Sequence, residues 1–286
     1  MIELAGEKLS ATIDPFGAEL TSLRDAEGRE LMTDADPAYW TGHAPLLFPI
    51  VGRLNGDVLR VDGREHAMKQ HGFARRMDWD VVGAGEDAVT LRLTDTVETR
   101  AAWPFGFDIA ILYAIDGATL SCVVRVINTG DTPMPMSFGF HPAFAWPLPY
   151  GRPRAAHRIR FDKAEADTVV RLDGGLFAGE RPSPMAGQEL PLADALFDRD
   201  ALIWSPVASQ SVLYGAADGP QLRIDFPGAP DLGLWTKPGA AFVCIEPWWG
   251  HADPAGFDGD IWAKPGIVRI EPGDERSFKM HVTLVD

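Results

Sequence analysis

The sequence predicts an all-β protein, built as one large antiparallel β-sandwich with a few short helices. Apolar residues alternate with polar ones in short segments, as in strands that have one face in water. The 29 glycines and 23 prolines separate these segments with turns, and no amphipathic stretch is long enough for a major helix. Because all-β sandwiches commonly place about 200–250 residues in one domain, we expect a single domain over residues 1–286.

The individual elements follow from these patterns along the chain. Predicted strands cover residues 79–82, 89–93, 120–126, 158–161, 222–226, 241–245 and 278–285. The Asp-Gly pairs at 116–117, 173–174 and 218–219 predict hairpin turns. Short helical turns are expected at 36–40, 94–102 and 192–197. Proline and glycine are dense at 145–153 and 173–191, which we expect to be long loops over one face, where a β fold usually places its ligand groups.

The charge balance excludes several classes of partner. The chain carries 26 basic and 41 acidic side chains, a formal net charge of −15, without a run of clustered lysines or arginines. Proteins that bind nucleic acid or anionic membranes need such clusters, so we expect neither partner. The N-terminus lacks the basic and apolar regions of a signal peptide, and no stretch reaches the roughly 20 apolar residues of a membrane-spanning helix. We therefore expect a cytoplasmic protein.

The common cofactor and metal motifs are missing. Residues 83–88 fit the Gly-x-Gly-x-x-Ala dinucleotide fingerprint, but a strand pattern follows where that fingerprint requires a helix, so we interpret them as a hairpin turn. There is no phosphate-binding lysine loop, no serine elbow, no His-Glu-x-x-His motif and no cysteine pair at metal spacing. We expect neither a cofactor nor a metal. Cys122 and Cys244 lie in apolar runs, which favours buried reduced thiols, with one buried disulfide as the alternative.

Three segments place titratable side chains in apolar surroundings, namely 69–75, 137–144 and 243–250. His141 lies between a phenylalanine and a proline, so its neighbourhood should favour the neutral imidazole. Glu246 ends an apolar strand directly before a proline, where a carboxylate is costly unless it has a partner or a task. A glutamate base and a histidine acid held apart across a cleft would suit proton transfer at neutral pH.

Each of these residues also has a structural interpretation. His141 would then be a core histidine satisfied by a backbone carbonyl, and Glu246 would form a salt bridge to Arg75 or Arg53. Arg53 follows a buried run and a glycine, so it holds either ligand hydroxyls or a strand-end ion pair. The aromatic candidates for the C–H face of a sugar are Trp40, Trp248 and Trp249, although most of the nine tryptophans are expected in the core. Solvated surface positions are expected for His43, His66, His157 and His251.

At these residues the sequence resembles the aldose 1-epimerase (galactose mutarotase-like) superfamily, and most closely its LacX-type branch. The similarity runs nearly from end to end, and the order and spacing of its segments make it specific. The matching segments are 17–23 (GAELTSL), 47–53 (LFPIVGR), 70–75 (QHGFAR), 99–107 with WPF at 103–105, 139–144 (GFHPAF), 196–202 (LFDRDAL) and 244–250 (CIEPWWG). The resemblance implies a supersandwich of antiparallel sheets that interconverts the α and β anomers of an aldose.

The resemblance also assigns roles by position. Glu246 matches the family's general base, which takes the proton from the anomeric hydroxyl at C1. His141 matches the general acid, which protonates the ring oxygen O5 so that the ring opens to the aldehyde. His71 matches a second histidine that hydrogen-bonds the substrate, and Arg53 matches a substrate-contacting arginine. Trp248 is expected to bind the sugar as well.

Two further positions concern substrate specificity. Asp200 matches an aspartate that holds sugar hydroxyls, with Asp198 as the alternative two residues away. Arg75 belongs to a stretch shared with a glucose-6-phosphate 1-epimerase branch, so a phosphate is an alternative ligand for it. A phosphate normally attracts several cations, and we favour an unphosphorylated sugar. Residues 54–57 depart from the Ala-Asn-Arg continuation of galactose mutarotases, which weakens the expectation of galactose itself.

Alternatives of other classes stay open. The first is a hexose-6-phosphate 1-epimerase, and the second is a non-catalytic sugar-binding or regulatory protein on the same fold. A glycoside-processing enzyme ranks last, because it needs two opposed carboxylates and only Glu246 has a persuasive context. The expected partner is a small sugar, and a homodimer is left open.

Overall fold

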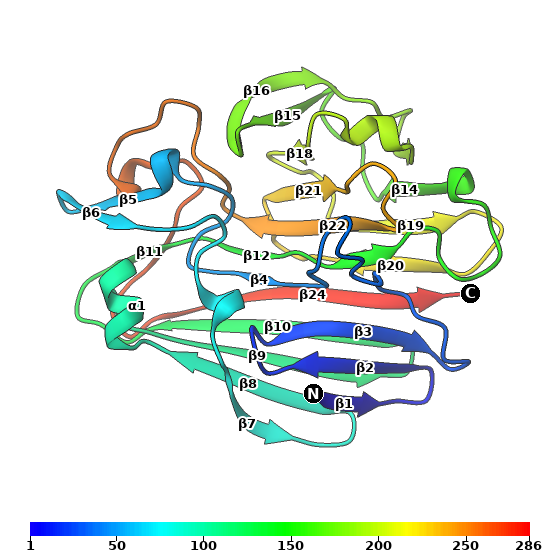
Figure 1. The fold of residues 1–286 in the computed structure, drawn as a ribbon, viewed down its shortest axis with the longest axis horizontal. Helices are drawn as coiled ribbons and strands as arrows, with labels where there is room; N and C mark the ends of the chain where they lie inside the picture. The colour runs from blue at the N-terminus through cyan, green and yellow to red at the C-terminus, as the bar shows by residue number, and fades with distance from the viewer.

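The computed structural model describes residues 1–286 and confirms the predicted all-β class (Figure 1). Its largest layer is a nine-stranded antiparallel sheet. The strands, in spatial order, are β17 (Glu189–Pro191), β14 (His157–Phe161), β19 (Ser211–Ala216), β20 (Gln221–Asp225), β24 (Glu275–Val285), β10 (Thr119–Asn128), β9 (Phe107–Asp116), β8 (Ala88–Thr94) and β7 (Asp80–Ala84). The expected hairpin turns at 116–117 and 218–219 join β9 to β10 and β19 to β20.

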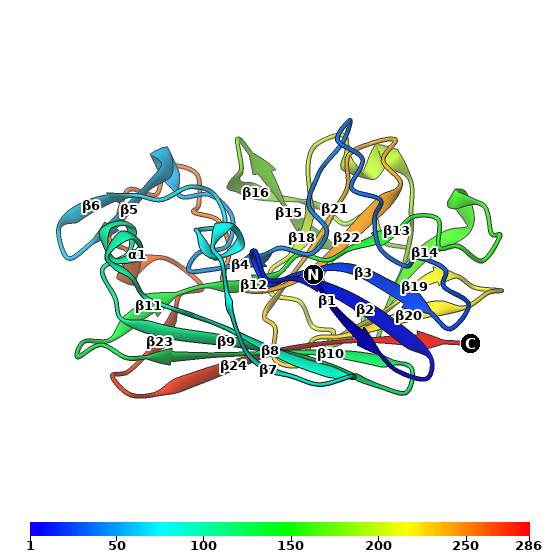
Figure 2. The same ribbon diagram turned by 60° about the horizontal axis from the view of Figure 1, so that its bottom comes forward.

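A second antiparallel sheet of eight strands packs above the first, which forms the lower layer in Figure 2. Its strands, in spatial order, are β16 (Leu176–Pro182), β15 (Thr168–Asp173), β18 (Leu202–Trp204), β21 (Asp231–Trp235), β22 (Phe242–Trp249), β12 (Phe138–Phe140) and β4 (Leu46–Leu47), with β13 (Ala143–Ala145) also paired to β22. The central strand β22 is buried along its whole length.

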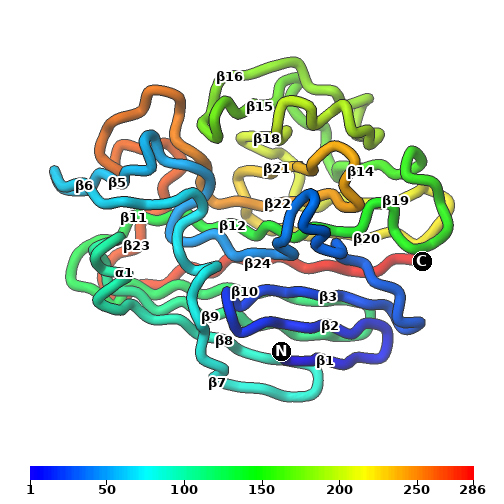
Figure 3. Tube along the Cα trace, viewed as in Figure 1, coloured from blue at the N-terminus to red at the C-terminus, as the bar shows by residue number.

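Smaller elements complete the sandwich. A three-stranded sheet contains β1 (Ile2–Ala5), β2 (Leu9–Asp14) and β3 (Glu19–Asp25), and two further pairs are β5 (Val58–Val61) with β6 (Arg64–Ala67) and β11 (Met134–Met136) with β23 (Val268–Ile270). The helices are α1 (Val97–Ala102), η1 (Asn55–Asp57), η2 (Ala74–Arg76), η3 (Arg154–Ala156), η4 (Asp194–Phe197) and η5 (Ile261–Ala263). No helix here has the length and apolar character needed to cross a membrane. The trace in Figure 3 shows the three-stranded sheet lying across β8 to β10, where the Tyr113 hydroxyl donates to the Ala18 carbonyl over 2.8 Å.

Strand alternation divides β22 between two environments. Val243 and Ile245 join the main core, a cluster of 65 buried residues that draws on nearly the whole chain. Cys244 and Trp248 belong to smaller clusters instead. Because successive strand side chains point to opposite faces, Glu246 shares the face of Cys244 and Trp248 and points away from the main core.

The expectation of a continuous loop over 173–191 is wrong in part. This segment contains β16, which pairs with β15, and the short strand β17. Strand β16 lies at a sheet edge and is mostly exposed, so it carries no buried alternation by which the sequence could reveal it. Helical structure is confirmed within 94–102 and 192–197. Residues 36–40 form a single turn, in which the N–H groups of Tyr39 and Trp40 donate to the Asp36 carbonyl over 2.9 and 3.0 Å.

Both cysteines are buried free thiols, as expected. The expected surface position is wrong for His157 and His251, which are both buried. The Nε2 atom of His157 accepts the backbone N–H of Leu148 over 3.0 Å, and the ring of His251 stacks on Phe177 with centroids 4.2 Å apart. Polar neighbours in the sequence concealed this burial, because the covering groups come from other segments.

Candidate active site

Two neighbouring strands bring His141 and Glu246 together. Gly139 of β12 pairs with Trp248 of β22, so two steps farther along the same antiparallel register place His141 opposite Glu246. The Nε2 atom of His141 lies 3.2 Å from Oε2 of Glu246. Both residues are buried, with 8% and 2% of their surface exposed.

This contact corrects the expected geometry. We expected an acid and a base held apart across a cleft, but the two side chains touch. Neither Arg53 nor Arg75 forms an ion pair with Glu246, so the salt-bridge alternative is not observed. The Nδ1 atom of His141 is buried without a hydrogen-bond partner, which argues against a core histidine satisfied by a carbonyl.

Burial biases both groups toward their neutral forms. It raises the pKa of Glu246 well above the usual range, and the charge of Asp200 acts in the same direction. Burial also lowers the pKa of His141 to about 3, with a smaller effect of the same sign from Arg75. In this environment we infer that the pair holds one proton, which Glu246 keeps while His141 stays neutral.

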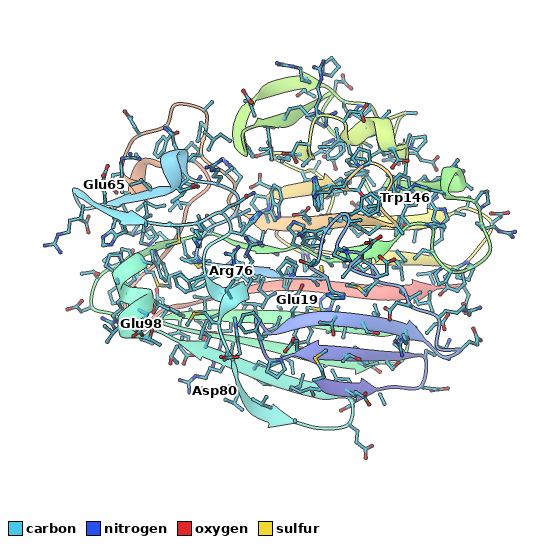
Figure 4. All side chains as sticks on the ribbon, in the orientation of Figure 1. Glu19, Glu65, Arg76, Asp80, Glu98 and Trp146 are labelled. Atoms are coloured by element: carbon cyan, nitrogen blue, oxygen red, sulfur yellow. The ribbon has the colours of Figure 1, made fainter.

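The pair lies in the wall of a cleft with a volume of about 840 Å³, within the roughly 300–1,000 Å³ of small-molecule sites. Every predicted site residue except Arg53 lines it, namely Glu246, His141, His71, Asp200, Arg75 and Trp248. Further lining side chains are Glu19, Trp40, Gln70, Arg76, Phe177, Trp235 and Lys237. Figure 4 labels two of them, Glu19 at the start of β3 and Arg76 in η2, near the middle of the molecule.

Arg53 lies outside this lining. Its guanidinium donates to both carboxylate oxygens of Asp57, over 2.8 and 2.9 Å, and to the Gly174 carbonyl over 3.2 Å. The carboxylate four residues along the chain engages Arg53 at the Nε and Nη2 positions, while the stem of the side chain lies beside Gly175, which lines the cleft. The ion pair that the sequence left open is therefore observed, and the contact between Arg53 and substrate stays a prediction.

His71 is fixed by the backbone next to the pair. Its ring lies edge-on to that of His141, with centroids 5.8 Å apart. The N–H of Gly52 donates to Nδ1 of His71 over 3.1 Å. Although part of the ring reaches solvent, the surrounding protein lowers the pKa of His71 well below its usual range, first by burial and then by the charges of His141 and Arg75. A neutral ring that accepts at Nδ1 carries its hydrogen on Nε2, so His71 presents a donor.

Asp200, and not Asp198, faces the cleft. Asp198 follows η4 and is exposed. The backbone of Asp200 has a φ of 68°, in the left-handed region that is uncommon for such a residue. Its carbonyl accepts a hydrogen bond from Arg171 over 3.1 Å, and its Oδ1 accepts the N–H of Ala201 over 2.8 Å. These contacts hold a strained conformation that positions the carboxylate.

Trp248 owes its place to glycines on both neighbouring strands. A Cβ atom at Gly139 or at Gly233 would lie 2.6 Å from the indole, so neither position tolerates a side chain without displacing the ring. The indole Nε1 is buried and has no hydrogen-bond partner. The indole N–H lowers the pKa of Glu246, whereas burial raises that pKa and has the larger effect. Trp249, on the opposite face of β22, packs in the main core.

Aromatic rings also cover His141. Trp40 stacks on the imidazole with centroids 5.0 Å apart, and Trp235 lies edge-on at 5.9 Å. Glu19 holds the loop that carries Trp40, because its Oε1 accepts the backbone N–H groups of residues 43–44 over 2.6 and 2.9 Å. In Figure 2 this loop stands beside the loop that follows β21.

The sequence-based candidates did not include several of the lining residues, among them Glu19, Phe177, Trp235 and Lys237. Only Glu19 had a signal, since it lies inside the matching segment 17–23. The other three lie in an edge strand, a strand end and a turn without a motif. Only the folded arrangement of β16 and the loop after β21 brings them to the cleft.

Three cationic side chains share the cleft, Arg75, Arg76 and Lys237. Burial lowers the pKa of Arg75 to about 10, Arg76 adds to the shift and Glu19 opposes it, so Arg75 remains charged at neutral pH. Its Nη2 donates to the Gln70 carbonyl over 3.0 Å, and its buried Nε has no partner. An anionic group on a ligand would therefore find donors on this side of the cleft.

A buried ion pair supports the cleft wall. Lys264 Nζ lies 3.0 Å from Oδ1 of Asp253, with 0% and 3% of the two side chains exposed, and it donates to the His251 carbonyl over 2.6 Å. The backbone N–H of Asp253 donates to the Arg53 carbonyl, and its own carbonyl accepts the N–H of Phe177, each over 2.9 Å. The ion pair thus ties together the segments that carry Gly52 and the cleft-lining Phe177.

Known proteins of one family are similar to this chain. A model of the aldose 1-epimerase family matches residues 1–250. The chromosomal protein LacX of Lactococcus lactis subsp. lactis is 29% identical over 297 residues, which cover 100% of this chain and 99% of the relative.

Solved structures show similar architectures. A galactose mutarotase related enzyme from Lactobacillus acidophilus superposes with a TM-score of 0.92 at 30% identity, over 100% of this chain and 97% of that one. A galactose mutarotase-like protein from Lactobacillus casei ATCC 334 has a TM-score of 0.92 at 29% identity, over 100% of both chains.

Proposed function

Since the chain belongs to the aldose 1-epimerase family, we propose that it interconverts the α and β anomers of a free aldose by general acid-base catalysis. Family membership confirms the resemblance seen in the sequence, and the solved relatives confirm the supersandwich fold. The observation that carries the proposal is the contact between His141 and Glu246 in the wall of the cleft.

The proposed reaction uses the two groups in turn. Glu246 takes the proton from the hydroxyl at C1, His141 gives a proton to O5, and the C1–O5 bond breaks to leave the open-chain aldehyde. Rotation about C1–C2 presents the other face of the carbonyl, and the reverse transfers close the ring. Both oxygens are bonded to the same carbon, so the groups that reach them must be neighbours. Direct contact therefore suits this reaction better than the separation we expected.

The protonation state of the pair fits this cycle. Movement of the shared proton across the 3.2 Å contact converts the neutral pair into a carboxylate and an imidazolium, which are the forms that open the ring. No exchange with solvent is needed. A positioned acid or base typically contributes about 10²–10⁴-fold, which is ample for a reaction that already proceeds in water.

The geometry favours this proposal over a glycoside-processing enzyme. Such an enzyme needs a second carboxylate opposite Glu246, with the histidines away from it. Here the nearest titratable partner of Glu246 is His141, and His71 lies beside it. The alternative, a non-catalytic sugar-binding protein, is distinguished from an epimerase by the following experiment.

The wild-type protein should accelerate the approach to anomeric equilibrium of freshly dissolved α-glucose or α-galactose. The rate is followed by polarimetry, or at equilibrium by saturation-transfer NMR, against the spontaneous rate in the same buffer. An inert protein across common hexoses, pentoses and hexose 6-phosphates would contradict the proposal. Saturable sugar binding without faster exchange would identify the non-catalytic alternative.

A second candidate, a hexose-6-phosphate 1-epimerase, is favoured by the cations Arg75, Arg76 and Lys237 in the cleft. The substitution Arg76→Met separates the two substrates, because a lost hydrogen bond to a charged group costs about 1.5–3 kcal/mol. We expect kcat/KM for the free aldose to stay unchanged. A drop of roughly tenfold or more confined to the phosphorylated sugar, together with a wild-type preference for that sugar, would assign the phosphate.

A further inference from the structure

We propose that Cys244, His141 and Glu246 form a binding site for Zn²⁺ or a similar soft divalent cation, and that the bound ion blocks the acid-base pair. Donor atoms of the three residues lie within 4.8 Å of one another, and all three residues are buried. The blocking effect rests on the proposed function, whereas the binding does not.

The strand geometry supplies this donor set. Cys244 and Glu246 are two residues apart on β22, so both point to the same face of the sheet. Glu246 lines the cleft, Cys244 lies beside it in a small buried cluster, and His141 reaches them from the neighbouring strand. In a tetrahedral site with metal–ligand bonds of about 2.0–2.1 Å, two nitrogen or oxygen donors are separated by about 3.3 Å. The 3.2 Å between Nε2 of His141 and Oε2 of Glu246 already matches that separation. The thiol lies within 4.8 Å of the other two donors, and it completes the third position by approaching an ion with a zinc–sulfur bond of about 2.3 Å.

The imidazole is available as a ligand. The Nδ1 atom of His141 is buried without a partner, so no hydrogen bond opposes a turn of the ring that presents either nitrogen. The cleft in front of Glu246 and His141 leaves the fourth position open to a water molecule or a sugar hydroxyl.

The donor chemistry selects the ion. Thiolate, imidazole and carboxylate are the usual ligands of zinc, and a thiolate disfavours Mg²⁺ and Ca²⁺. A thiol and a carboxyl group bind such an ion only after they lose their protons, so its affinity should rise with pH. A dication would also balance the two negative charges that this leaves in a buried place.

A protein with the metal ion bound cannot catalyse the proposed anomer interconversion. A metal ion on Glu246 removes the lone pair that takes the proton from O1. The same ion on His141 prevents the ring from carrying a proton to O5. We expect Zn²⁺ to lower the exchange rate, and added chelator to restore it.

The test uses Co²⁺ as a spectroscopic substitute, with no sugar present. Wild type should show a thiolate-to-cobalt charge-transfer absorption that Zn²⁺ displaces, and Mg²⁺ should not displace it. Cys244→Ala should lose this absorption, and Cys244→Ser keeps the side-chain size as a second variant in case alanine disturbs the fold. The matched control is Cys122→Ala, which removes the other buried thiol from the main core and should leave the absorption unchanged.

Two results would overturn the site. One is a wild-type protein without the charge-transfer absorption, and the other is a Cys244→Ala variant with unchanged Zn²⁺ affinity. For activity, each protein is compared with itself in the presence and absence of Zn²⁺, and the inhibition should be lost in Cys244→Ala. An inactive wild type that still binds Co²⁺ through the thiol would contradict the proposed function and leave the metal site standing.

Discussion

Replacing Glu246 with glutamine is expected to lower kcat for anomer interconversion by about 10²–10⁴-fold, while the protein remains folded and still binds sugar. The amide fits the space of the carboxylate but cannot take the proton from O1. Its N–H group would donate to Nε2 of His141, only 3.2 Å away in the wild type, and so keep the ring without a proton for O5. Both halves of the proposed reaction are disabled by one change. Saturation-transfer NMR measures the exchange rate, and calorimetry measures sugar binding.

Asp198→Asn is the matched control, because it makes the same carboxylate-to-amide change at an exposed residue that follows η4 and does not line the cleft. It should leave kcat unchanged. A wild-type rate in Glu246→Gln would show that the assigned base is wrong. A loss in Asp198→Asn as large as that in Glu246→Gln would show that we chose the wrong aspartate when we placed Asp200 in the cleft.

The pH profile of wild type and Glu246→Gln tests the same assignment. The reactive pair holds one proton. Above the raised pKa of Glu246 the pair loses that proton and has none to give to O5, so the rate should fall with rising pH. Toward the lowered pKa of His141, about 3, a second proton binds and Glu246 can no longer act as a base. The wild-type rate, corrected for the spontaneous reaction, should show a plateau between these limits, and Glu246→Gln should lack the fall at high pH.

The sequence predicts the fold class well because alternation is strong wherever a strand has one buried face. Strands β8, β10 and β24 alternate between buried and exposed positions and were expected close to their observed bounds. Strand β16 lies exposed at an edge. Its residues therefore carry no hydrophobic pattern, and its pairing with β15 depends on a partner rather than on its own composition.

The sequence predicted which residues form the candidate site, but not how they are arranged. An apolar context identified His141 and Glu246, but their contact depends on the register of β12 with β22, which no local pattern reveals. Arg53 shows the converse. Its sequence context allowed a ligand contact or an ion pair, and the structure shows the ion pair with Asp57.

The burial of charged side chains was the feature least predictable from the sequence. Lys264 lies between an alanine and a proline, and a lysine usually keeps its ammonium group in water, yet 0% of its side chain is exposed. Its carboxylate partner, Asp253, also lies in a loop with glycines and prolines nearby. The two meet because the loop from 250 to 254 folds back under the cleft, where Asp253 Oδ2 also accepts the N–H of Asn55 over 2.8 Å.

Replacing Lys264 with methionine is therefore expected to lower the free energy of unfolding by about 3–5 kcal/mol, the cost of leaving one member of a buried ion pair without its partner. Methionine fills a similar volume, so the loss reports the uncompensated charge of Asp253 rather than a cavity. The double variant Lys264→Met/Asp253→Asn should recover part of this loss, because no buried charge then remains. Urea unfolding at one pH measures all three proteins, provided that the slopes agree.

An exposed ion pair supplies the control for this comparison. Arg125 and Glu275 lie 3.3 Å apart with 54% of each side chain exposed, so Arg125→Met should cost only about 0–1 kcal/mol. If Lys264→Met cost no more than Arg125→Met, Asp253 would have to find another partner or a proton in the variant, and the ion pair would not be what holds the cleft wall. If the loss is large and the double variant recovers, the charge of Lys264 is needed chiefly because Asp253 is buried beside it. The 2.9 Å backbone contacts of Asp253 with Arg53 and Phe177 would then depend on a residue that never touches the sugar.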